Sequence, residues 1–361
     1  MIKTNIKKSL LLASISLIGL SSAFASDRMP DKENVASSSL SESPQKSLRD
    51  MPLEILGKIA DNLPPKDLVR LQNLTGDKLL ADKTHSPEFY RQNVNVMTFD
   101  MLNFNEANAL IMFLQEAPQD ACTSLKLENF TLEMLRRMLP YGNKLVSLDL
   151  KDNKIGDAGA QAIAKSQTLS NLTALNLDRN QICDDGVQAI AESPSLSKLT
   201  SLSLNNAFIS VTGVQTIVNS PILANLTSLN LEHNRIGVAW ELALADFRIL
   251  NKLTVLNLSH NWISDTGVQV IAKSPALANL TSLNLEHNRI SVNGAQAIVN
   301  SPILANLRIL ALAGNQIGDT GAQAIVASPT LVSLTSLEIG ANPISAAGRL
   351  AIKTRCPFAR I

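Results

Sequence analysis

The sequence predicts an α/β solenoid, a horseshoe with parallel strands on its concave face and helices on its convex face. Three observations lead to this prediction. A leucine returns at equal intervals and opens eight successive units without insertion or deletion, at Leu145, Leu172, Leu199, Leu226, Leu253, Leu280, Leu307 and Leu334. Each unit begins with apolar and polar residues in alternation, as in a strand, and continues with a helix-forming segment such as GAQAIA. Aromatic residues make up only 4% of the 361 residues, and an aliphatic core suits layers that repeat one shape.

Each unit has the form L-x-x-L-x-L-x-x-N-x-I. The leucines of its L-x-L segment, such as Leu148 and Leu150, are expected to point inward from a short parallel strand. The asparagine turns the chain, and its amide can satisfy backbone groups there. A Ser-Pro pair is expected to end most of the helices. An aspartate just ahead of the helix is expected to cap it in four units, at Asp157, Asp184, Asp265 and Asp319.

This pattern resembles the leucine-rich repeat, in its ribonuclease-inhibitor-like form, over residues 145–361. Residues 94–144 are similar to degenerate copies of the repeat and are expected to cap the first regular layer. Two units depart from the pattern. Ala207 replaces the asparagine of the third unit, and the fourth lacks Ser-Pro and carries Trp240. We favour sequence drift over a local adjustment of curvature as the reason.

Residues 1–25 read as a secretory signal peptide. Three lysines precede an apolar run at residues 10–20, and Ala23-Phe24-Ala25 offers small residues for cleavage before Ser26. The apolar run is too short to span a bilayer, and no later run is long enough, so we expect no stable membrane insertion. Residues 26–47 are polar and Ser-rich and are expected to form a linker.

Residues 48–93 are expected to form a small helical module. They resemble the F-box in the segments Met51-Pro52-Leu53-Glu54-Ile55-Leu56, Asp67-Leu68 and Pro87-Glu88-Phe89-Tyr90. The resemblance implies binding of a Skp1-type subunit through Pro52, Ile55, Leu56, Ile59, Leu63 and Leu68. Met51 replaces the usual leucine, and Gly76-Asp77 stands where a basic residue and an aromatic are common. The alternative is a helical cap for the solenoid, which needs the same apolar spacing.

An F-box before repeats with a G-A-x-A segment is similar to the GALA-type effectors of bacterial pathogens. The resemblance implies a secreted adaptor that acts in the host cytosol and recruits a host Skp1-cullin ubiquitin ligase to a target bound by the repeats. The alternative is a leucine-rich-repeat binding or adhesion protein of the periplasm or cell surface.

Residues at two offsets from each opening leucine are expected to face outward on the concave strands. In three consecutive units the seventh position is histidine, and in four units the ninth position alternates aromatic and arginine residues. We predict that this region binds the target protein through Phe208, Glu232, His233, Arg235, His260, Trp262, Glu286, His287 and Arg289. A zinc-binding or pH-sensitive histidine ladder is an alternative. Simple duplication is another, because residues 218–225 and 299–306 are identical. We therefore predict no metal site.

Other function classes find no support in the sequence. Motifs of hydrolases, phosphate-binding loops and zinc proteases are missing, so we predict a protein without catalytic residues or cofactors. The formal net charge of +1 gives no strong attraction to nucleic acid, and we expect no nucleic-acid partner. The three cysteines are widely spaced, and we expect them to be packing thiols.

Overall fold

The structure is a computed structural model, and it describes residues 97–100, 110–111, 114–115, 124–234, 236 and 249–361. These residues belong to one compact unit, formed by residues 94–115 and 119–361. The proposed signal peptide, linker and F-box-like module lie outside the described residues, as do Cys122 and Trp240. No helix among the described residues is long and apolar enough to cross a membrane.

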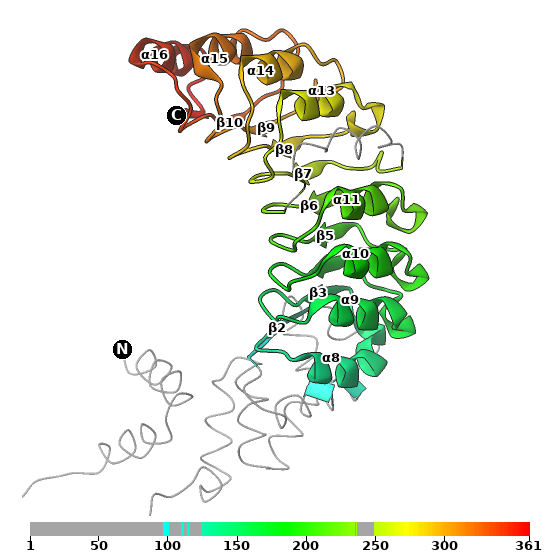
Figure 1. Ribbon diagram of the computed structural model, residues 1–361. Coiled ribbons are helices and arrows are strands. Elements are labelled where there is room, and N and C mark those ends of the chain that lie inside the picture. Colours follow the sequence, from blue (N-terminus) through cyan, green and yellow to red (C-terminus); the bar gives the residue numbers. More distant parts are fainter. Residues whose placement is uncertain (1–96, 101–109, 112–113, 116–123, 235, 237–248) are drawn as a thin grey trace, which may run out of the picture. The chain divides into compact units, whose positions relative to one another are not determined.

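The described strands form one parallel sheet of 11 strands, in which each strand pairs with the next along the chain. Eight of them, β3 to β10, begin at equal intervals along the chain, so the strand recurs with the sequence repeat. Helices lie along one side of the stacked strands (Figure 1). The predicted α/β solenoid is confirmed. The strands are β1 Met97–Asp100, β2 Ser124–Glu128, β3 Ser147–Asp149, β4 Ala174–Asn176, β5 Ser201–Ser203, β6 Ser228–Asn230, β7 Val255–Asn257, β8 Ser282–Asn284, β9 Ile309–Ala311, β10 Ser336–Glu338 and β11 Ala359–Arg360.

The core is a stack of aliphatic side chains that repeats in every layer. In the fifth unit, Leu253, Leu256 and Leu258 are fully or almost fully buried. The strand register places Leu256 directly between Leu229 and Leu283 of the neighbouring strands. Full burial of such a side chain stabilises the fold by about 1.5–3 kcal/mol. No layer can bury its leucines alone, so each repeat depends on its neighbours.

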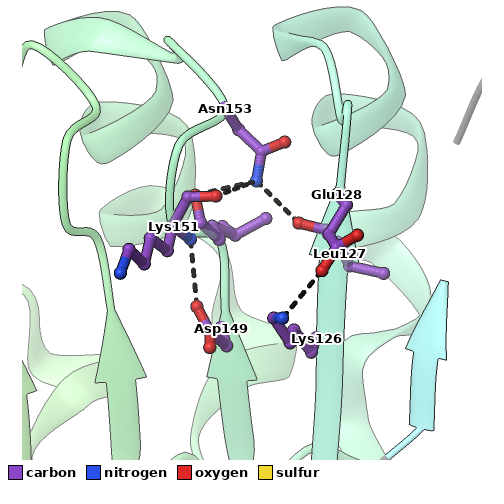
Figure 2. Close-up of polar contacts among 7 residues, drawn as sticks. Lys126, Leu127, Glu128, Asp149, Lys151 and Asn153 are labelled. Carbon is purple, nitrogen blue, oxygen red and sulfur yellow. Dashed lines mark hydrogen bonds and ion pairs between the residues drawn. The ribbon is translucent and has the colours of Figure 1, made fainter. Parts of the chain in front are cut away.

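Buried asparagines tie each repeat to the one before it. Figure 2 shows the first of them, Asn153, whose amide nitrogen donates to the carbonyl oxygens of Leu127 (2.7 Å) and Leu150 (2.8 Å). Later members also accept hydrogen bonds from backbone N–H groups 25 or 27 residues earlier, so one side chain satisfies both donors and acceptors of the turn. We call this set the asparagine ladder: Asn153, Asn180, Asn234, Asn261, Asn288, Asn315 and Asn342. Ala207 interrupts it and is fully buried.

Short helices follow the strands, and most end where the sequence predicts. For example, α10 ends at Ala191 and α13 at Lys273, just before Ser193-Pro194 and Ser274-Pro275. The proline then opens a 3₁₀-helix. The α-helices are α8 Leu132–Met138, α9 Gly156–Lys165, α10 Asp184–Ala191, α11 Val211–Val218, α13 Asp265–Lys273, α14 Val292–Val299, α15 Gly318–Val326 and α16 Ala346–Arg355. The 3₁₀-helices are η2 Leu139–Lys144, η3 Gln167–Leu169, η4 Pro194–Leu196, η5 Pro221–Leu223 and η6 Pro275–Leu277.

The prediction that each aspartate caps its own helix is wrong. Asp265 is the first residue of α13, and its carboxylate accepts hydrogen bonds from the backbone N–H groups of Ser291 (2.7 Å) and Gly294 (3.0 Å). These groups belong to the start of α14, so the aspartate caps the helix of the following repeat. The same relation holds for Asp157, Asp184 and Asp319. This capping contact also explains why position 294 is glycine, because a Cβ atom there would lie 2.6 Å from the Asp265 carboxylate.

The expectation of packed cysteines is wrong for one of the described thiols. Cys183 is exposed at the N-cap of α10, where its backbone N–H donates to Asp157. Cys356 is half-buried after α16, and burial raises the pKa of its thiol. At position 183 it is therefore the backbone N–H that contributes to the fold, and the thiol lies at the surface.

Candidate functional site

The predicted target-binding residues that the structure describes lie in the loops that follow the strands, and not on the strands themselves. Strand β6 ends at Asn230, three residues before His233. The residue seven positions after each opening leucine has a left-handed backbone, with φ between 49° and 68°. Aspartate, asparagine, histidine and glycine tolerate this conformation better than most residues. The eight residues are Asp152, Arg179, Asn206, His233, His260, His287, Gly314 and Ala341.

Three imidazole rings stack at the middle of this row. The ring centroids of His233 and His260 are 4.0 Å apart, and those of His260 and His287 are 4.3 Å apart. The ring planes differ by only 10° and 16°. The backbone sets this spacing, because His233 N–H donates to Ser259 and His260 N–H to Glu286, each in the next repeat. We call His233, His260 and His287 the histidine stack.

The environment of the histidine stack lowers the pKa of its middle imidazole. Burial lowers the pKa of His260, and the imidazoles of His233 and His287 lower it further, while Glu232 opposes this effect. Glu232 itself is half-buried and accepts a hydrogen bond of 3.1 Å from the side-chain amide of Asn257 on β7. The His260 imidazole and an oriented carboxylate therefore lie close together.

An exposed aromatic side chain and a guanidinium group form the second part of the site. The side chain of Trp262 is 54% exposed, and the Arg289 guanidinium carbon lies 5.6 Å from the centre of its ring. This separation is within the range of a cation–π interaction. Phe208, which belongs to an earlier repeat, is 42% exposed. Arg235, which the sequence places between Phe208 and Trp262, lies outside the described residues.

Two exposed aliphatic residues on the strands were not part of the predicted site. Val255 and Ile309 are 40% and 45% exposed, and both pair with Ser282, one from each side. They are the first residues of β7 and β9, where the other regular repeats have serine or alanine. A valine or isoleucine at a position that is otherwise serine or alanine is the sequence signal from which these two residues could have been predicted. Together with Trp262 they add apolar surface to the middle repeats.

One group of described side chains brings metal-ligating atoms close together. Ligand atoms of Glu232, His233 and His260 all lie within 4.8 Å of one another. Glu286 takes the corresponding place two repeats further, where its carboxylate is 3.5 Å from the amide of Asn284. The site as a whole thus offers apolar, cationic and metal-ligating groups, all of them in the loops and strands of the middle repeats.

Comparison with known proteins defines the class. The leucine-rich repeat family model matches six segments, at residues 143–164, 168–191, 223–239, 250–272, 276–299 and 304–326. With the parallel sheet and the flanking helices, these matches show a leucine-rich-repeat solenoid. Solenoids of this kind present extended surfaces on which protein partners bind.

Solved structures similar to this chain include two internalins from Listeria monocytogenes. The internalin inlF is 18% identical, and the match covers 84% of this chain and 94% of that one with a TM-score of 0.45. Internalin C2 is 21% identical, and the match covers 70% and 91% with a TM-score of 0.44. No curated protein sequence matches this chain.

Proposed function

We propose that this protein is a non-enzymatic interaction adaptor whose middle repeats bind a target protein. The observation that carries the proposal is the exposed pair of Trp262 and Arg289 beside the histidine stack. Tryptophan and arginine are the residues most often found at energetic hot spots of protein interfaces. Val255 and Ile309 add exposed apolar surface on strands β7 and β9 of the same part of the solenoid. Contact with a partner would remove this surface from water.

The second half of the proposal concerns residues 48–93. Their apolar spacing supports an F-box that binds a Skp1-type subunit through Ile55, Leu56 and the other residues named above. The signal-like residues 1–25 support export from the producing cell. The protein would then act as a secreted bacterial effector that brings a host Skp1-cullin ubiquitin ligase to the target held by the repeats.

The Skp1 half is tested by titration calorimetry of the chain from Ser26 onward with purified eukaryotic Skp1. We expect binding that is lost in an Ile55→Ala/Leu56→Ala variant and kept in Val69→Ala, a control that removes an apolar side chain from outside the predicted contact set. Circular dichroism of each variant checks that the repeats remain folded. Absence of binding by the unmodified chain would refute the F-box assignment.

The target half is tested with a second pair of variants. We expect Trp262→Ala/Arg289→Ala to lose a partner that the unmodified chain captures by crosslinking, because the exposed aromatic and guanidinium groups supply the contact. Phe358→Ala is the control, since Phe358 is also an exposed aromatic but follows the last helix. A partner that binds both variants equally does not use the middle repeats.

A second candidate is a periplasmic or surface binding protein in which residues 48–93 only cap the solenoid. It rests on the export signal, because a Sec-type signal leads to the periplasm without any step into a host. A cap buries the apolar face that an F-box leaves open. This candidate therefore predicts no Skp1 binding, together with unfolding of the first repeats in Ile55→Ala/Leu56→Ala.

A further inference from the structure

The histidine stack and Glu232 bring metal-ligating atoms close together at the junction of the fourth and fifth repeats. Glu232 and His233 follow β6, and His260 follows β7. Their ligand atoms lie within 4.8 Å of one another. Two atoms bound to the same tetrahedral zinc ion are about 3.4 Å apart. The His233 and His260 rings lie stacked and nearly parallel, so one of them must turn out of the stack before both can point at one ion. His233 is exposed and His260 half-buried, which leaves these side chains free to turn.

We propose that Glu232, His233 and His260 form a binding site for a divalent first-row transition-metal cation of the zinc type. Two imidazoles and one carboxylate are ligands that such ions favour over magnesium or calcium, which prefer oxygen alone. Three protein ligands leave a position for water. Because the ligands come from two repeats, the ion would also link those repeats.

The backbone conformation does not account for this arrangement. A left-handed turn favours histidine, but equally aspartate, asparagine or glycine, and some of the other repeats use those residues at the same position. Three consecutive repeats carry histidine instead, which places metal-binding side chains in adjacent layers with ring centroids 4.0 and 4.3 Å apart.

One further contact prepares the site. The Asn257 amide donates to the Glu232 carboxylate, as residues around metal ligands commonly do to orient them.

The test is titration of untagged protein, from Ser26 onward, with zinc chloride by calorimetry, and with cobalt(II) by visible absorption. We expect one equivalent to bind. His233→Asn, His260→Asn and Glu232→Gln should each weaken binding at least about tenfold, and Asn257→Ala should weaken it about tenfold as an orienting residue. Asparagine is chosen because it tolerates the left-handed backbone.

A matched control comes from the equivalent position two repeats further. Glu286→Gln should keep zinc affinity within about threefold, because Glu286 is not one of the three ligands. Unchanged thermal unfolding of the metal-free variants shows that they fold. The proposal is overturned if zinc does not bind saturably, or if His233→Asn and His260→Asn bind it as tightly as the unmodified chain.

Discussion

The asparagine ladder makes a quantitative prediction at Asn288, which is buried. Its side-chain oxygen accepts hydrogen bonds from the backbone N–H groups of Asn261 (3.0 Å) and Ile263 (2.9 Å). Its amide nitrogen donates to the carbonyl oxygens of Leu258 and Leu285, each at 3.0 Å. An Asn288→Ala variant removes all of these bonds and leaves a small cavity.

The loss of stability in Asn288→Ala follows from the backbone groups that lose their hydrogen-bond partner. Two backbone N–H groups lose their acceptor in a buried place, and each such loss costs about 1–3 kcal/mol. Leu285 keeps one partner, because its carbonyl also accepts from the Asn315 amide. We therefore expect Asn288→Ala to lower the free energy of unfolding by about 2–6 kcal/mol.

Urea denaturation measures the total, and hydrogen exchange locates it. The amides of residues 261 and 263 should lose protection first, because they are the ones that lose an acceptor. Asn279→Ala is the control in the same region: Asn279 is exposed and donates one bond of 2.7 Å to Asn251. It should cost less than about 0.5 kcal/mol. A cost below about 1 kcal/mol for Asn288→Ala, with both amides still protected, would refute the reasoning.

Three further outcomes are expected. Ala207→Asn supplies the asparagine that the ladder lacks and should raise the free energy of unfolding, measured in urea, by about 1 kcal/mol. A decrease would mean that the third repeat is packed too tightly around Ala207 to hold the larger side chain. Gly294→Ala puts a Cβ atom 2.6 Å from the Asp265 carboxylate and should lower the urea midpoint, at a cost of about 1–3 kcal/mol. The lowered pKa of His260 means that the unfolded chain binds a proton more readily than the folded chain. Stability should therefore fall as the pH drops below its ordinary value of 6.5, and fall less in His260→Asn, as urea titrations on both sides of that pH will measure.

The sequence by itself determined the solenoid. An uninterrupted period with inward leucines leaves each layer one way to bury its apolar side chains, which is against the next layer of the same shape. The parallel strands, the Ser-Pro helix ends and the buried asparagines all follow from that repetition. At these positions the local preference of each residue and the packing of the layers favour the same structure, so the sequence pattern was sufficient to predict it.

Only the tertiary structure decided which repeat each polar group serves. Asp265 stands at the start of its own helix in the sequence, yet its carboxylate caps the helix of the next repeat, 26 and 29 residues away. The reason is that helices in adjacent layers begin side by side, and the glycine at position 294 lets the carboxylate approach.

For the candidate site, too, the sequence predicted one part and the tertiary structure decided the other. The sequence placed three histidines and Trp262 at equivalent positions, but alternation suggested strands where the backbone makes left-handed turns. Whether side chains of successive repeats touch depends on the spacing of the strands and on the direction of each turn. Stacking of His233 on His260, and of Arg289 over Trp262, arises only when the layers are assembled, because a full repeat of the chain separates the members of each pair.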